Sequence, residues 1–203
     1  MRFRELIQDP SASIDAIASY LDGLSAEDRL AETRTLSRDE QRTLYQKAEK
    51  APPITLDHFV PSDMAKLAPV HHDGRNTLPL PLGSLKLFQK RFCRPEDGSA
   101  RLFGYNQSPF LGTVGPGFFV ALPTKGRPEW EKRGDVVIDY FQVPDGPVAA
   151  GWPKVIPNSK GLQVLVYNGT RDYMRKVSQH VSIGAAYKGE KALDHYFILC
   201  RDR

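Results

Sequence analysis

The sequence lacks several features that mark specialised classes of protein. No segment approaches the roughly eighteen consecutive apolar residues of a membrane-spanning helix, and residues 1–10 have no apolar stretch of the kind found in a secretory signal. Only two cysteines occur, Cys93 and Cys200, and both lack the Cys or His neighbours of a redox or metal motif. We therefore expect a cytoplasmic protein with no membrane span, whose two thiols are reduced and buried.

Motifs of several enzyme classes are also missing. The chain has no Gly-x-Ser-x-Gly pentapeptide, which argues against the nucleophile elbow of the common serine hydrolases. A glycine-rich stretch at residues 112–117 matches no nucleotide-binding fingerprint and precedes a strand-like segment, so we interpret it as a sharp turn or as a lid over a pocket. No cofactor is indicated. No metal site is predicted either, because the five histidines show no known ligand spacing; they are His58, His71, His72, His180 and His195.

The composition is that of an ordinary folded protein, but the charge is unevenly distributed. Hydrophobic residues make up 40% of the chain and charged residues 26%, which predicts a packed core rather than disorder. Residues 1–53 contain 8 Lys/Arg and 10 Asp/Glu, whereas residues 54–203 contain 20 and 14, so the second segment carries the positive charge. This excess is compatible with an anionic ligand or partner, and it is also what ordinary solubility requires.

Residues 1–53 have the pattern of short amphipathic helices. Apolar residues recur at helical spacing over residues 12–23, and further helices are expected to begin at residues 25–28 and at the capping-box pattern of residues 37–40. Each helix has one narrow apolar stripe, which is too little for a stable bundle. We expect the stripes to pack on the rest of the chain, in one compact unit, or else on a protein partner.

Residues 54–203 instead contain apolar runs of strand length separated by Gly, Pro and Asn. The connections leave little room for crossover helices, which favours antiparallel pairing. We predict an α+β fold in which the N-terminal helices pack on a curved, mainly antiparallel sheet of about seven strands, either barrel-like or open. A helix over residues 170–178 is an alternative for one segment. The predicted strands are residues 85–93, 100–105, 117–122, 135–143, 162–167, 177–186 and 193–200.

Residues 171–187 are the segment richest in reactive side chains. If residues 178–183 are extended, His180 shares one face with two serines, and that face meets either solvent or the inside of a curved sheet. A histidine that faces the inside of a curved sheet can act as an acid, a base or a ligand anchor. We therefore predict Tyr173, Arg175 and His180 as ligand-binding residues, while catalytic residues stay unknown.

Basic and aromatic residues alternate along residues 86–94, which places Phe88, Lys90 and Phe92 on one face of a strand. Such a face is suited to stacking and charge contacts with a single-stranded nucleic acid. We favour a structural interpretation, in which a bulge near residue 88 returns the phenylalanines to the core and leaves the lysines at the edge. A nucleic-acid partner is accordingly not expected.

Three functions are consistent with these patterns. The first is a soluble domain that binds a small anionic or amphipathic molecule in the concave side of the sheet. The second is an enzyme in which His180 is the general acid or base and Tyr173 or Arg175 stabilises negative charge. The third is a non-catalytic interaction or assembly module that binds a protein partner through the N-terminal helices or through residues 86–94. Whether the protein is an enzyme is left open.

Overall fold

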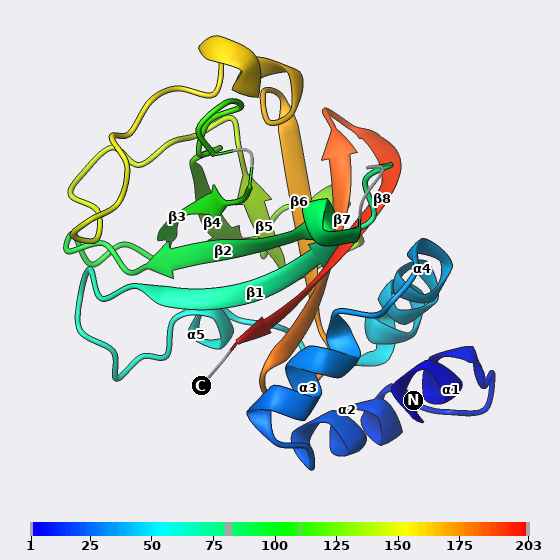
Figure 1. The fold of residues 1–203 in the computed structure, drawn as a ribbon. Helices are drawn as coiled ribbons and strands as arrows, with labels where there is room; N and C mark the ends of the chain where they lie inside the picture. Colours follow the sequence, from blue (N-terminus) through cyan, green and yellow to red (C-terminus); the bar gives the residue numbers. More distant parts are fainter. Residues whose placement is uncertain (1, 80–82, 110, 202–203) are drawn as a thin grey trace.

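The fold was obtained as a computed structural model that describes residues 2–79, 83–109 and 111–201. Its strands are β1 (Val70–Asn76), β2 (Leu87–Cys93), β3 (Leu102–Gln107), β4 (Phe119–Pro123), β5 (Val136–Asp139), β6 (Thr170–Lys176), β7 (Val181–Lys188) and β8 (Lys191–Arg201). Each strand pairs antiparallel with the next along the chain, and β8 returns to pair with β1, so the sheet closes into a barrel (Figure 1). The predicted α+β fold with a curved antiparallel sheet is confirmed, and the barrel-like alternative is the one observed.

Several segments of the structure differ from the sequence prediction. The strand β1 was not predicted, because its sequence VHHDGRN contains no apolar run. Residues 162–167 are not a strand. Most of them belong to the 3₁₀-helix η3 (Gly161–Leu165), whose first residue, Gly161, has φ +66°. Leu162 and Leu165 in this helix are exposed. Residues 170–176 are the strand β6 rather than a helix. The apolar residues of this segment show no clean two-residue period, because both faces of β6 are mostly buried. Their spacing was therefore also compatible with a helix.

Residues 2–47 form four short helices, as the sequence patterns predicted for three of them. They are α1 (Arg2–Gln8), α2 (Ile14–Asp22), α3 (Ala26–Thr33) and α4 (Arg38–Lys47), and the last continues into the 3₁₀-helix η1 (Ala48–Lys50). Ser37 and Glu40 form the predicted capping box at the start of α4, in which each side chain accepts a hydrogen bond from the other residue's backbone N–H. Side-chain caps of this kind satisfy backbone groups that a short helix otherwise leaves unpaired.

The helices cover the outer face of β7 and β8 (Figure 1). Their buried residues share one apolar core with the outward-facing side chains of these strands, for example Leu21 and Leu44 with Ile183 and Ile198. The prediction that the helical stripes pack on the rest of the chain is therefore confirmed. No helix in the described part of the chain has the length and apolar character needed to cross a membrane.

One end of the barrel is closed by residues 54–60, which include the short helix α5 (Leu56–Phe59). Phe59 packs against Phe92 with ring centroids 5.0 Å apart. The Phe59 carbonyl also forms a 3.0 Å hydrogen bond with Nε2 of His72, which is fully buried in β1. The inward-facing side chains at this end form a continuous apolar core with α5. Any internal space must therefore open toward the opposite end.

Candidate functional site

The lumen of the barrel contains a cavity of about 330 Å³. Residues near the open end surround its mouth, and they come from the connections between strands and from the start of β8. Aromatic side chains of the strands line the deeper walls. Most of the lining is apolar: Leu78, Leu85, Phe88, Val114, Tyr140, Val166, Tyr167, Ala186, Leu193 and Phe197 all contribute. The cavity is closed by α5 and its packed core on the far side.

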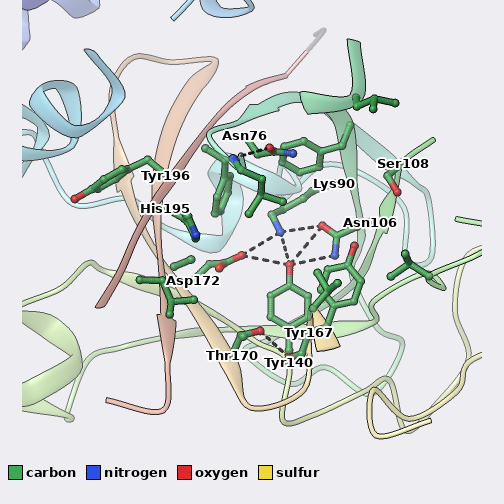
Figure 2. Close-up of a pocket in the computed structure, with 18 residues that line it drawn as sticks. Asn76, Lys90, Asn106, Ser108, Tyr140, Tyr167, Thr170, Asp172, His195 and Tyr196 are labelled. Carbon is green, nitrogen blue, oxygen red and sulfur yellow. Dashed lines mark hydrogen bonds and ion pairs between the residues drawn. The ribbon is translucent and has the colours of Figure 1, made fainter. Parts of the chain in front are cut away.

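Strand alternation brings polar side chains into this cavity from opposite walls. Along β2, Lys90 points inward between two phenylalanines, and along β6, Asp172 points inward between Thr170 and Met174. Asn106 of β3 and Tyr140, just after β5, point to the same place. Figure 2 shows the four side chains meeting inside the cavity. Because β2 and β6 lie on opposite sides of the closed barrel, closure is what places Lys90 beside Asp172.

Lys90 is the centre of a hydrogen-bond network. Its ammonium group donates to Asn106 Oδ1 at 2.9 Å, to Asp172 Oδ2 at 3.1 Å and to the Tyr140 hydroxyl by a short hydrogen bond. Tyr140 in turn donates to Asp172 Oδ2 at 3.2 Å. The Asn106 amide donates to the Tyr140 oxygen and to the backbone carbonyl of Gly117. An ammonium group has three N–H bonds, so all three donors of Lys90 are used within the protein.

The Lys90–Asp172 ion pair is almost completely removed from solvent. Lys90 is 2% exposed and Asp172 is 6% exposed. Burial lowers the pKa of Lys90 and raises the pKa of Asp172, and each charge opposes the effect of burial on the other. Four aromatic rings within 5.6 Å of the Lys90 nitrogen add favourable cation–π contacts, the nearest being Phe197 at 4.7 Å. The ion pair and the rings therefore offset part of the cost of burying the ammonium group.

Two tyrosines beside the pair are held in their neutral form. Burial raises the pKa of Tyr140 well above its ordinary value, and the neighbouring Asp172 charge raises it further. Burial also raises the pKa of Tyr167, to about 12. The two rings stack with centroids 5.3 Å apart and form one wall of the cavity. A neutral, aromatic wall of this kind favours contact with an apolar molecule.

Several polar groups that line the cavity retain unused hydrogen-bonding capacity, and two of them, Asp172 and His195, lie at the ion pair and beside it (Figure 2). Asp172 Oδ1 accepts no hydrogen bond from any residue that the structure describes, and it is not enclosed by protein atoms, so it faces the cavity. His195 of β8 has no partner for either ring nitrogen within the same ranges. Burial, assisted by the nearby Arg38 charge, lowers the pKa of His195, which leaves the ring neutral at pH 7.

The predicted ligand-binding residues lie outside this cavity. Tyr173 and Arg175 alternate with Asp172 along β6 and therefore point to the outer face of the barrel. There Tyr173 packs edge to face on Tyr187, with ring centroids 5.1 Å apart, and Arg175 donates to the backbone carbonyl of Tyr45 at 2.9 Å. The structure brings these two side chains to the same outer face, and none of the three predicted residues lines the cavity. Their role in ligand binding stays a prediction.

His180 lies in the turn between β6 and β7, at the closed end of the barrel. Residues 178–180 form a bend, so the predicted shared strand face of Ser178, His180 and Ser182 is wrong. Residues 177–180 connect the two strands, since β6 ends at Lys176 and β7 begins at Val181. Of the three, Ser182 alone lies in the strand, where it is fully buried.

The alternation along residues 86–94 is observed, but the expected bulge is not. The pairing of β1 with β2 runs without a shift from Val70 opposite Phe92 to Arg75 opposite Leu87. Phe88, Lys90 and Phe92 therefore share the inner face, and the interpretation of Lys90 as an edge residue is wrong. The signal that identifies it is a lysine between two phenylalanines on one strand face. Asp172 lacks this signal, because its neighbours on the same face are Thr170 and Met174, and the helical alternative for residues 170–178 obscured its position further.

A second hollow of about 290 Å³ lies at the closed end, lined in part by His58, Lys176 and Arg201. Burial lowers the pKa of His58 well below its ordinary value, and the surrounding positive charges act in the same direction. No group of three or more His, Cys, Asp or Glu side chains that could hold a metal ion occurs in the described ranges. No protein-family model matches the sequence, and neither a curated protein nor a solved structure is significantly similar to it.

Proposed function

We propose that this protein binds a small amphipathic molecule in the lumen of its barrel. The observation that carries the proposal is the cavity itself: it is closed at one end, open at the other, and lined mainly by apolar and aromatic side chains with a few convergent polar groups. Sites for small molecules in proteins have this composition, and the mouths of β-barrels are a common place for them. A cytoplasmic location, expected from the sequence, belongs to the same proposal.

The size of the cavity indicates the size of the ligand. A volume of about 330 Å³ corresponds to about eleven water molecules at ~30 Å³ each. It lies at the lower end of the range of ~300 to 1,000 Å³ for small-molecule pockets. A ligand with roughly a dozen non-hydrogen atoms would fill such a space. A decyl chain with a single polar end group is a suitable probe.

Of the two ligand types expected from the sequence, the geometry favours the amphipathic one over the anionic one. Lys90 is the only lysine or arginine among the described residues that line the cavity, and its charge is already neutralised by Asp172. An anion would have no unpaired positive charge to bind and would lie close to a carboxylate. Because desolvation of an unpaired charge is costly, an added negative charge is disfavoured there.

A variant that fills the cavity tests this proposal. Ala186 lines the cavity, and Ala186→Phe places a ring in the space that the ligand would occupy. The control is Ala100→Phe, at an exposed position in the connection between β2 and β3. Binding of 1-decanol, decanoate and decylamine is measured by ligand-observed NMR. We expect at least one probe to bind the native protein and the Ala100→Phe variant, and Ala186→Phe to weaken that binding at least ten-fold. Equal binding by all three proteins, or no binding of any probe, would contradict the proposal.

The other two functions have less support from the cavity. An enzyme that uses His180 would act at the closed end, where the side chain is separated from the lumen cavity by the packed core. A protein partner of the N-terminal helices would have to contact their outward sides, since their apolar stripes are buried on β7 and β8. A nucleic acid would not reach Phe88 and Phe92, which point into the lumen.

A further inference from the structure

We infer that the molecule bound in the lumen carries an uncharged hydroxyl group, which donates a hydrogen bond to Asp172 Oδ1 and accepts one from the ring of His195. This inference rests on the proposed function and names the chemical class of its ligand, an alcohol with an apolar body. The polar groups around the ion pair decide it, because Lys90, Asn106 and Tyr140 already use their hydrogen-bonding groups within the protein.

The saturated groups cannot select a ligand. The three donors of Lys90 are directed to Asn106, Tyr140 and Asp172, and the hydroxyl proton of Tyr140 is directed to Asp172 Oδ2. A ligand acceptor such as a carboxylate would have to break one of these hydrogen bonds to bind Lys90 or Tyr140. Asp172 Oδ1, by contrast, is an acceptor without a donor in the described protein. It requires a ligand, or water, that donates.

Strand pairing places Asp172 and His195 at a distance suited to one small group. Asp172 pairs with Ala186 across β6 and β7. On the other side of β7, Ala185 pairs with Tyr196 and Tyr187 with Ala192, so residues 193–195 lie opposite Ala186. The backbones of β6 and β8 are therefore two strand spacings apart, about 10 Å. Both side chains point into the cavity from these strands (Figure 2). Ala186, on the strand between them, also lines the cavity and contributes only a small methyl group.

His195 faces the lumen because it continues the inward alternation of Leu199 and Phe197 along β8. A bulge lies directly beside it: the register between β7 and β8 shifts between Ala185 and Tyr187, so β8 contains extra residues there, and Asp194 within the bulge has φ +53°. Bulges are common next to binding sites. The neutral imidazole of His195 offers one donor and one acceptor. A hydroxyl group is the smallest group that can donate to Asp172 and also accept from such a ring.

Charged end groups fit the same place poorly. A carboxylate would meet the Asp172 charge, and an ammonium group would add a second cation close to Lys90 without a free counter-ion. In a cavity of low dielectric both arrangements are unfavourable. An ether of the same length lacks the proton that Asp172 Oδ1 requires. Among ligands with apolar chains of equal length, the cavity should therefore bind most tightly those with an uncharged end group that donates a hydrogen bond.

The test compares four probes of similar length: 1-decanol, decyl methyl ether, decanoate and decylamine. We expect 1-decanol to bind on the order of 10- to 100-fold more tightly than each of the other three, because the hydrogen bond to a charged acceptor is lost or an unpaired charge is buried. The variant pair Lys90→Met/Asp172→Leu keeps the volume and removes both charges, which a fold usually tolerates better than removal of one. It should bind the alcohol and the ether equally. His195→Phe should weaken alcohol binding without weakening ether binding.

The outcomes separate this inference from the proposed function. If decanoate or decylamine binds the native protein more tightly than 1-decanol, and Ala186→Phe abolishes that binding, the lumen site stands and the hydroxyl inference is wrong. If the double variant keeps the native preference for alcohol over ether, Asp172 is not the acceptor and the inference is wrong. If no probe binds, or if Ala186→Phe binds every probe normally, the proposed lumen site falls and the inference falls with it.

Discussion

Arg42 of helix α4 forms an ion pair with Asp194 in the bulge of β8, and the distance from Arg42 Nη2 to Asp194 Oδ2 is 2.8 Å. Arg38, one turn earlier in the helix, contacts the same carboxylate at 2.9 Å and also donates to the Asp194 backbone carbonyl. Asp194 adopts a left-handed backbone conformation, which is costly for a residue other than glycine. The helix therefore holds the bulge next to His195, and this links the N-terminal segment to the candidate site.

Removing these two arginines should lower the affinity for ligand more than it lowers the stability of the fold. In Arg38→Ala/Arg42→Ala the bulge loses its anchor, so we expect a several-fold loss of 1-decanol affinity. The ion pairs are exposed to solvent, so the free energy of unfolding should fall only slightly. Isothermal titration calorimetry and urea unfolding measure the two quantities. Lys132→Ala, which removes an exposed ion pair to Glu129, is the control and should change neither. Unaltered affinity in the double variant would show that the bulge needs no anchor.

Removal of one member of the buried ion pair should cost more than removal of both. Lys90→Met leaves Asp172 buried without its counter-charge, and such a change typically lowers the free energy of unfolding by ~3 to 5 kcal/mol. The double variant Lys90→Met/Asp172→Leu should lose less, because no unpaired charge remains. Urea unfolding at pH 7 compares them. A double variant that is less stable than Lys90→Met would contradict the view that the two charges mainly compensate each other.

Acid should destabilise the protein through its buried histidines. Burial lowers the pKa of His72 to about 3, whereas the unfolded chain binds that proton near pH 6.5. The unfolded state therefore gains protons first, so stability is fully present above about pH 7 and falls by up to ~1.4 kcal/mol per pH unit between pH 6.5 and 3. His72→Gln keeps a donor for the Phe59 carbonyl and should flatten this slope in urea unfolding. Ser182→Ala, another buried inward-facing position, should keep the slope of the native protein.

The aromatic lining of the lumen should be sensitive to one glycine. A Cβ atom at Gly184 of β7 would lie 2.3 Å from the Phe197 ring and 2.7 Å from the Met174 sulfur. Phe197 covers the Lys90 ammonium, so Gly184→Ala must displace a ring of the cavity wall. We expect a loss of roughly 1 to 3 kcal/mol in the free energy of unfolding, together with weaker probe binding. Gly83→Ala is the control, since no atom of the residues that the structure describes lies within 4 Å of the added atom. Native stability in Gly184→Ala would contradict the packing described.

The sequence predicted the architecture better than the site, and the reason is physical. Apolar runs, turn residues and capping patterns are local, and they identified the helices and most of the strands. Closure of the barrel is not local, since it depends on β1, whose histidines, aspartate and arginine resemble no buried strand. Closure is also what brings Lys90 and Asp172 together across the lumen.

The candidate site residues were misplaced because a strand can be buried on both faces. Tyr173 and Arg175 are buried on the outer side of β6, under η1 and the Trp130 segment, while Asp172 is buried on the inner side. Periodicity alone does not tell which face is the lumen. An isolated charge flanked by apolar neighbours on the same face, as Lys90 is on β2, was the available signal.

The most direct test of the central claim is to locate 1-decanol on the protein by intermolecular NOEs to methyl groups. We predict NOEs to Leu85, Val166 and Leu193, which line the lumen cavity. NOEs confined to methyl groups of the N-terminal helices, such as those of Leu24 and Leu30, would contradict binding in the lumen.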